Sequence, residues 1–346
     1  MSAVIDLSSG YTIRDKDLLE RLAQAKPIVR DVVTRECEQI QAKRDNRAAL
    51  STIKRRRVQT ADLFREEKGA SRDDLQHIHS VLAICSLPYT RQDISVREWE
   101  RKQGDMKLLV QAGKLMDPTG NWVEQPLPFG SRSRLILLHT CSEAIRTKSA
   151  TIEIEDSLSG FMKAMGLQVT GGKNGSLNSF KQQINALAAC SMTFGFFNGK
   201  QSSTMSAKPF KKIDVFYMKD PAQPPLWPSQ ITFSPEFFDT LAKHALPVNM
   251  HAVRAFSGSA RKLDIIFWLG FRIRGEGITR ISWEALAEQF GEGYARLDNF
   301  KRDFVREIAE IKEVFEKLPV RFSDTGIEVS HSVSEVLAIP TKGRKA

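Results

Sequence analysis

Apolar residues recur at helical spacing along most of the chain, and short alternating stretches separate the helical ones. Between 131 and 146, Leu135, Leu138 and Cys141 fall three positions apart, which predicts the buried stripe of a helix. The stretch 151–155 instead alternates as a strand does. The order expected from here on is helix 131–146, strand 151–155, helix 157–167, helix 176–189, strand 191–197, polar loop 198–212 and strand 213–218. This order is typical of a winged helix-turn-helix.

A second series of elements follows a stretch with four prolines, 221–230, which predicts a stiff linker. Ser234 and Pro235 match the residues preferred where a helix begins. The elements expected here are helices 234–245 and 257–273, a strand within 277–283, helices 283–291 and 294–318, and a hairpin over 319–332. Helix, strand, two helices and a hairpin therefore occur twice.

The third helices of the two series share a phrase, Leu-(Asn or Asp)-x-Phe-Lys, with apolar residues at i, i+3 and i+7. We interpret the two series as an internal repeat. The predicted fold class is α+β, mostly α, with two tandem winged helix-turn-helix domains preceded by a helical N-terminal region. The predicted domains are a helical, basic arm (1–70), a first winged-helix domain with an N-terminal helix and β-hairpin extension (71–220), a linker (221–232), a second winged-helix domain (233–335) and a basic tail (336–346).

The segment before the repeat is predicted to be largely helical. Residues 12–57 carry apolar positions at helical spacing within a highly charged sequence, and 72–87 is expected to form one amphipathic helix. The stretches 106–113 and 121–128 are expected to pair as a β-hairpin across an Asp-Pro-Thr-Gly turn.

The repeat indicates which side chains of the third helices point away from the core. The exposed faces carry amides in the first copy and arginines with one amide in the second, and such groups can bond adenine and guanine edges in the major groove. The ordinary alternative is a solvated polar face. The residues predicted to contact DNA in the second copy are Tyr294, Arg296, Asn299, Lys301, Arg302 and Arg306. Those of the first copy and its turn are Lys173, Asn174, Ser176, Asn178, Ser179, Lys181, Gln182 and Asn185.

Net charge changes the picture further, because 51 Lys and Arg against 41 Asp and Glu give +10. A basic surface favours anionic partners, chiefly nucleic acid. The cations between 43 and 57 fit either a solvated helical face or an arm that contacts phosphates, and both interpretations stay open. The phosphate contacts predicted for wings and arm are Lys200, Lys208, Lys211, Lys212, Arg321, Lys54, Arg55, Arg56 and Arg57.

Several other classes of protein find little support. The four cysteines form no CxxC or Cys/His pattern, which favours free thiols in a reducing cytosol over disulfides or zinc. No secretory signal and no stretch with the ~18–20 apolar residues of a membrane span are visible, so we expect a cytoplasmic protein without membrane contact. The segment 170–176, TGGKNGS, lacks the GxxxxGK[ST] order of a phosphate loop. We therefore expect no catalytic residue, no metal and no small-molecule cofactor.

His77-Ile78-His79 offers one competing chemistry, because a His-hydrophobic-His strand with a nearby tyrosine is typical of metal-dependent DNA-nicking initiators and relaxases. In the expected helix the two imidazoles would diverge by ~100° per residue instead of sharing a face. We expect packed or partly exposed histidines and keep the nicking enzyme as the alternative.

The blocks 79–90, 97–113 and above all 127–177 resemble the plasmid-encoded RepA replication initiators of bacteria. The last block contains a Leu-Pro-aromatic-Gly lead, an Arg-Leu helix, a Thr-Lys-Ser turn and a glycine-rich turn before a helix. The resemblance implies a bacterial, plasmid-associated protein that binds double-stranded origin repeats (iterons) and helps to open the origin. It also implies recruitment of the host initiator and replicative helicase, and a switch between monomer and homodimer that controls copy number. A winged-helix transcriptional repressor shares the expected fold and is the second alternative.

Overall fold

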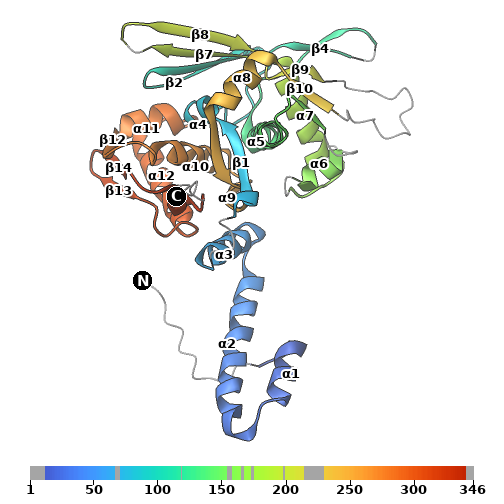
Figure 1. Cartoon of the computed structure of the whole chain (residues 1–346), viewed down its shortest axis with the longest axis vertical. Coiled ribbons are helices and arrows are strands. Elements are labelled where there is room, and N and C mark those ends of the chain that lie inside the picture. The colour runs from blue at the N-terminus through green and yellow to red at the C-terminus, as the bar shows by residue number, and fades with distance from the viewer. Residues whose placement is uncertain are drawn as a thin grey trace, which may run out of the picture. The chain divides into compact units, whose positions relative to one another are not determined.

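The structure, a computed structural model, describes residues 12–66, 71–117, 119–153, 158–164, 167–172, 175–197, 199–213 and 230–339. It is a mixture of helices and small antiparallel sheets, and the chain divides into two compact units, Met1–Gln59 and Thr60–Ala346 (Figure 1). Among the described residues, none of the helices combines the length and apolar character needed to cross a membrane.

The first unit contains helices, as predicted for 12–57. Its elements are α1 Lys16–Ala23, η1 Pro27–Val29, α2 Arg30–Ala49 and the beginning of α3 Thr52–Arg65. Polar contacts join α1 to α2: Arg44 donates hydrogen bonds of 2.6 Å to Asp15 and 2.7 Å to Asp17. The amide of buried Gln41 accepts from the backbone N–H groups of Arg14 and Asp15. The α1–α2 pair thus closes through ion pairs and one buried amide as much as through apolar burial.

The first half of the second unit confirms the helices of the first predicted series, with α5 Gly130–Thr147, α6 Leu158–Ala164 and α7 Ser176–Ala189. The short strand is β6 Thr151–Glu153. The other elements are η2 Arg72–Asp74, β1 Leu75–His79, α4 Ser80–Ile84, β2 Glu98–Gln103, β3 Met106–Gln111, β4 Lys114–Met116, β5 Trp122–Glu124, β7 Ser191–Phe197, β8 Ser202–Ala207, β9 Phe210–Ile213 and β10 Gln230–Phe233.

The second half confirms the second series. Its elements are α8 Pro235–His244, β11 Ala245–Asn249, α9 Met250–Phe256, α10 Ala260–Arg272, β12 Ile278–Ser282, α11 Trp283–Phe290, α12 Leu297–Lys312, β13 Val320–Ser323, β14 Gly326–Ser330 and η3 Ser334–Leu337. The long helix α12 ends at Lys312, before the predicted 318. Of the predicted linker, 221–229 lies outside the described residues and its end belongs to β10.

Two three-stranded sheets have the same antiparallel order. In the second half it is β12-β14-β13, with the strand that follows α10 at one edge and the last strand in the middle. In the first half it is β6-β10-β9, again with the strand that follows α5 at one edge and the last strand in the middle. The repeat inferred from helical periodicity therefore extends to the topology of the sheets.

A four-stranded sheet, β2-β3-β7-β8, corrects two predictions. The polar loop expected over 198–212 contains β8, which pairs with β7 from Phe197↔Ser202 to Met192↔Ala207. The serine-rich sequence of β8 hides this strand, because backbone pairing does not require apolar side chains. The hairpin expected between 106–113 and 121–128 is also wrong: β3 pairs with β2 and β7, and the Asp-Pro-Thr-Gly turn joins β4 to β5 instead.

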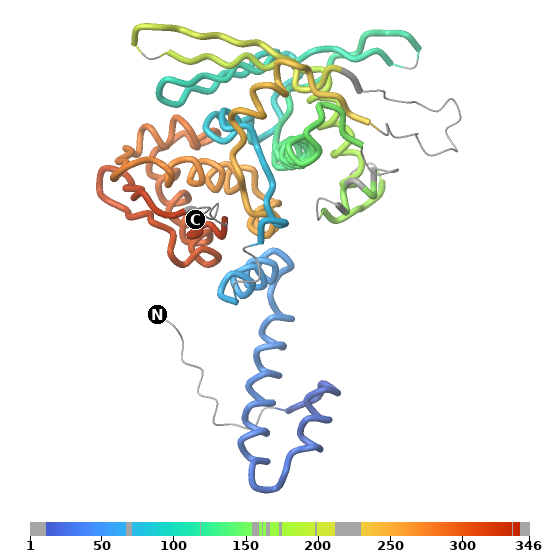
Figure 2. The backbone as a smooth tube through the Cα atoms, in the orientation of Figure 1, coloured from blue at the N-terminus to red at the C-terminus, as the bar shows by residue number. Residues whose placement is uncertain are grey.

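The helix predicted over 72–87 is the third correction. Residues 75–79 form β1, which pairs with β11 from the other half of the unit; the short 3-10 turn η2 precedes it, and only Ser80–Ile84 is α-helical. Figure 2 shows these two strands side by side. The register is symmetric about His77↔Pro247, and the last residue of each strand caps the helix that follows: His79 accepts from the N–H of Val81, and Asn249 from that of His251. A pairing between such distant segments leaves no local periodic signal.

One hydrophobic core cluster includes buried residues of both halves of the second unit. The predicted stripes are confirmed, since Phe180 and Ile184 of α7 and Phe300 and Phe304 of α12 are at most 1% exposed. Trp268 of α10 is fully buried and meets the edge of another core aromatic ring. The two repeats therefore share their apolar interior.

A buried ion pair joins the first helices of the two repeats. Arg134 of α5 donates two hydrogen bonds to Asp264 of α10, at 2.6 Å and 2.7 Å, and the side chains are 3% and 2% exposed. The remaining N–H groups of Arg134 bond to the carbonyls of Leu87, Pro88 and Gly130. All five guanidinium donors are therefore satisfied inside the core.

We predict that Arg134→Met destabilises the protein by about 3–5 kcal/mol, because it leaves the Asp264 carboxylate buried without its partner. Urea unfolding followed by circular dichroism measures the change. Arg280→Met is the matched control: Arg280 pairs with Glu328 at the surface, where an ion pair contributes only ~0–1 kcal/mol. Equal losses in the two variants would contradict the importance of the buried pair.

Candidate nucleic-acid interface

Helix α12 presents the predicted second recognition face to solvent. Phe304 and Ile308 pack into the core, which turns Asn299, Arg302 and Arg306 outward. The arginine side chains are 71% and 65% exposed. Asp303 lies between them, 3.5 Å from Arg302 and 3.2 Å from Arg306, and therefore limits the directions in which the guanidinium groups extend.

Tyr294, predicted to contact DNA, lies instead in a hydrogen-bonded network that fixes the start of α12. Its hydroxyl accepts from Arg261 at 2.7 Å and donates to Asp303 at 2.9 Å. Arg261 also donates two hydrogen bonds to Glu307. The hydrogen bond from Tyr294, followed by Arg306 and Arg302, lowers the pKa of Asp303, which keeps its carboxylate ionised beneath the exposed arginines. Tyr294 thus helps to position the exposed face of α12, and its hydroxyl is already engaged both as a donor and as an acceptor.

The two remaining residues of this face differ in accessibility. Lys301 is half-buried with its Nζ 5.8 Å from the ring centroid of Trp283. Arg296, immediately before α12, has a 75% exposed side chain and lies 3.7 Å from Asp298. Four of the six predicted residues therefore lie on the solvent-exposed side of α12: Arg296, Asn299, Arg302 and Arg306.

The face of α7 is more committed to internal contacts. Ser176 closes the glycine-rich turn, since its hydroxyl accepts from the N–H of Thr170 at 2.8 Å and donates to the carbonyl of Gln168 at 2.9 Å. Gly175 must lack a side chain here, because a Cβ would lie 2.2 Å from the carbonyl oxygen of Gly171. Of the other predicted turn residues, Lys173 and Asn174 lie outside the described residues.

Farther along α7, some predicted side chains form contacts within the protein and others are exposed to solvent. Ser179 accepts a hydrogen bond from Arg132 at 2.9 Å, and burial lowers the pKa of Lys181. Gln183, which the sequence did not single out, is buried and its Oε1 accepts from the N–H of Phe129. Of the remaining predicted residues, Asn178 and Gln182 are exposed and Asn185 is half-buried. This face is neutral and only partly available to a ligand.

The predicted wing lysines lie on or beside the strands that follow α7. Lys200, Lys208 and Lys211 are exposed, and the side chain of Lys212 lies outside the description. Arg321 is exposed on β13 of the other half. The strands β9 and β10 occupy the positions that β13 and β14 occupy in the second sheet. The segment 214–229 lies outside the described residues.

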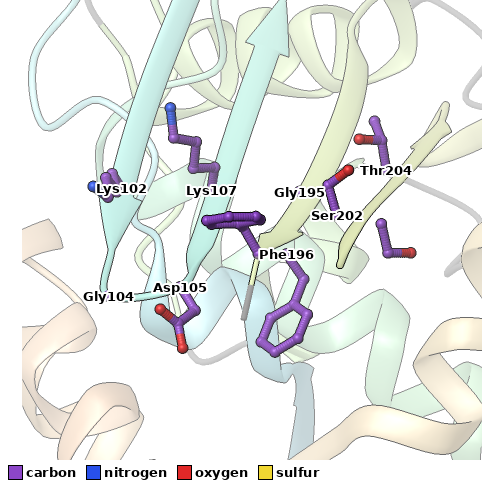
Figure 3. Close-up of a pocket in the computed structure, with 10 residues that line it drawn as sticks. Lys102, Gly104, Asp105, Lys107, Gly195, Phe196, Ser202 and Thr204 are labelled. Carbon is purple, nitrogen blue, oxygen red and sulfur yellow. The ribbon is translucent and has the colours of Figure 1, made fainter. Parts of the chain in front are cut away.

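Sequence reasoning missed two lysines on the four-stranded sheet. Lys102 and Lys107 are directly paired across β2 and β3, where like charges repel, and Glu100 at 3.0 Å from Lys107 offsets part of this repulsion. Figure 3 shows them beside a pocket of about 280 Å³. The pocket also contacts Phe196 and Phe197, which are 44% and 55% exposed. A pair of lysines flanking a Gly-Asp turn is the signal that could have found this surface.

Some of the basic side chains of the predicted N-terminal arm form contacts within the protein and are not free to bind a ligand. Lys54 is exposed on α3, whereas Arg55 donates to the carbonyls of Arg47 and Ala48 and thereby caps the end of α2. Arg56 and Arg57 are half-buried. The four consecutive cations therefore do not form one free patch, and Lys54 is the most accessible of them.

The histidine pair lies on a strand, not on the expected helix, but its second member is structural. His79 is 2% exposed, caps α4 and stacks on Phe194 at 5.3 Å. Burial, with a smaller effect of His244, lowers the pKa of His79 to about 4. Within the described ranges, no group of three or more His, Cys, Asp or Glu side chains is arranged to hold a metal ion.

Comparison with known proteins finds one family model and two solved structures that resemble the chain. Residues 127–287 match the family model described as plasmid encoded RepA protein, which confirms the resemblance noted in the sequence. Two crystal structures of domains 2 and 3 of RctB, one of them a selenomethionine derivative, share 9% identity with the chain at TM-scores of 0.47 and 0.48. The matches cover 73% and 75% of this chain and 98% and 99% of those chains. No curated protein matches the sequence.

We predict that Tyr294→Phe costs about 1 kcal/mol of stability, because it removes a hydrogen bond of an ordinary kind, while affinity for duplex DNA changes less than about twofold. Thermal unfolding and fluorescence anisotropy with labelled duplex measure the two quantities. A large loss of DNA affinity with unchanged stability would instead show that Tyr294 contacts DNA.

Proposed function

We propose that the chain is a plasmid replication initiator that binds double-stranded repeats (iterons) at the origin through two winged-helix modules. The observation that carries this proposal is one side of α12, where Arg296, Asn299, Arg302 and Arg306 reach solvent from a helix anchored in the core. The family match over 127–287 supports the role in replication.

The order of elements supports winged helices. In the second half α11 and α12 would form the helix-turn-helix, and the β13–β14 hairpin would be its wing. Gly326, at the start of β14, permits close packing of the hairpin against β12, because a Cβ there would lie 1.9 Å from the carbonyl oxygen of Ile281. The second helix of such a motif enters the major groove. Arg321 on the wing is then suitably placed for a phosphate contact.

The chemistry of the α12 face fits base recognition. Arginine bonds O6 and N7 of guanine in a bidentate manner, and asparagine bonds N6 and N7 of adenine. Asp303 restrains Arg302 and Arg306 from one side, so each guanidinium keeps free donors for a base edge. An arrangement that restrains long side chains before binding reduces the entropy lost in the complex.

The first module is the weaker reader in this proposal. Its α7 face offers neutral amides and hydroxyls, several already bonded within the protein. The β1–β11 pairing and the shared core would keep the two modules at a fixed spacing. The lysines of the β7–β9 region, with Lys102 and Lys107, would supply phosphate contacts that do not depend on sequence.

Origin opening, recruitment of the host initiator and replicative helicase, and a monomer–homodimer switch belong to the proposal through the family resemblance. The chain would act by binding, without catalysis, metal or small-molecule cofactor. Repression of its own promoter is compatible with the same DNA-binding surface.

We predict that Arg302→Ala and Arg306→Ala each weaken binding to the specific repeat by about 1–3 kcal/mol and relax the preference at one base position. Titration of labelled wild-type and base-substituted repeats by fluorescence anisotropy measures both effects. Lys317→Ala is the matched control, because it removes an exposed cation beyond the end of α12. Unchanged specific binding in both arginine variants would rule out α12 as the reader.

We predict that Lys54→Ala weakens specific and random duplexes by the same factor and reduces the slope of log K against log salt by about one. The measurement is a salt series on both duplexes. Arg21→Ala, which removes an exposed cation paired with Glu36, is the control. A loss confined to the specific repeat would contradict a phosphate-contacting arm.

A further inference from the structure

A second pocket of the second unit lies beside the β1–β11 ribbon and takes no part in the proposed recognition of bases. It has a volume of about 400 Å³. Four segments line it: the start of α4, the junction of α8 and β11, the end of α10 and the strand β12. The lining residues are Ser80, His244, Ala245, Leu246, Phe271, Arg272, Arg274, Gly275 and Thr279.

The two arginines of this pocket lack a counter-charge. Within the described part of the chain, the side chains of Arg272 and Arg274 form no ion pair and donate no hydrogen bond. The Nε of Arg272 is buried without an acceptor, and its guanidinium lies 5.6 Å from the ring centroid of Trp268. Burial lowers the pKa of Arg272, as expected where no anion offsets the desolvation of a cation.

This arrangement differs from that of two other arginines of the same unit, Arg134, which is buried, and Arg261, which is half-buried like Arg272. Arg134 is matched by Asp264 and Arg261 by Glu307, each through two hydrogen bonds. The free energy of burying a charge is normally offset in this way. Arg272 is the exception among these three, because its guanidinium lies near the rings of Trp268 and Phe271 and forms no ion pair with a described residue.

The other titratable groups at the pocket are basic as well. His244 lines it and lies 6.1 Å, between ring centroids, from His79. His77 on the adjacent strand has its pKa lowered by burial and then by the charge of Arg274. No carboxylate is among the lining residues. The charged and titratable side chains that line the pocket are therefore all basic.

We propose that this pocket binds a phosphate group, held by the guanidinium groups of Arg272 and Arg274 and the hydroxyls of Ser80 and Thr279. Arginine presents a planar fork of donors that matches phosphate oxygens. Phe271, 37% exposed, supplies an apolar wall. The volume lies at the lower end of the ~300–1,000 Å³ typical of small-molecule sites, so a nucleotide can supply the phosphate, as can the DNA backbone.

Isothermal titration calorimetry of the full chain with inorganic pyrophosphate tests the site. The expected result is one saturable site per chain, weakened about tenfold or more by Arg272→Gln and by Arg274→Gln. Arg280→Gln is the matched control, because Arg280 is exposed on β12 and does not line the pocket. Arg274 is itself exposed, so its variant remains informative if the Arg272 variant fails to fold.

Two further titrations, with ATP and with a random DNA duplex, distinguish the sources of the phosphate. A nucleotide site predicts that ATP binding follows the same pattern of variants while duplex affinity stays unchanged. A backbone site predicts that pyrophosphate competes with the duplex and that Arg274→Gln weakens the duplex. If neither pyrophosphate, ATP nor duplex binding responds to either variant, the proposal is wrong. Binding of wild-type protein to the origin repeat, measured without added phosphate, reports separately on the proposed function.

Discussion

Arg134 and Asp264 connect the first helix of one repeat to the first helix of the other at the centre of the second unit. An ion pair whose side chains are only 3% and 2% exposed is tolerated only when every donor finds an acceptor. Here three backbone carbonyls accept the remaining hydrogen bonds of the Arg134 guanidinium. These carbonyls belong to the segment after α4 and to the start of α5. The pair therefore fixes the angle at which α5 leaves its loop as well as its contact with α10.

The rest of the unit is arranged around this junction. The β1–β11 ribbon pairs the segments that precede the two repeats, with its symmetric centre at His77↔Pro247. Three-stranded sheets of matching order lie in each half, and one hydrophobic cluster includes residues of both. Two modules joined in this way can hold α7 and α12, the helices proposed to face DNA, at a constant separation, as the proposed binding to a repeat of fixed length would require. The pocket proposed to bind phosphate lies beside the same ribbon.

The helices of both repeats could be predicted because their signal is local: Phe180, Ile184, Phe300 and Phe304 recur at helical spacing and are buried. The strand β1 could not, since its partner lies far along the chain and its own sequence also fits a helix. The sequence also could not identify Asp264 as the partner of Arg134, because the two residues lie far apart along the chain. An arginine within an apolar helix does indicate that some buried partner exists. At the candidate interface, helical periodicity predicts that the arginines of α12 point outward. It cannot predict that the Tyr294 hydroxyl accepts a hydrogen bond from Arg261, because Arg261 belongs to another helix.

The account rests on the claim that the second unit reads short repeats in double-stranded DNA. DNase I footprinting of the purified chain on the non-coding DNA of its own replicon tests this claim most directly. The account predicts several protected segments of equal length at regular spacing, and loss of that pattern when Arg302 and Arg306 are replaced together by alanine. Protection without sequence preference, or a pattern unchanged by the double substitution, would contradict it.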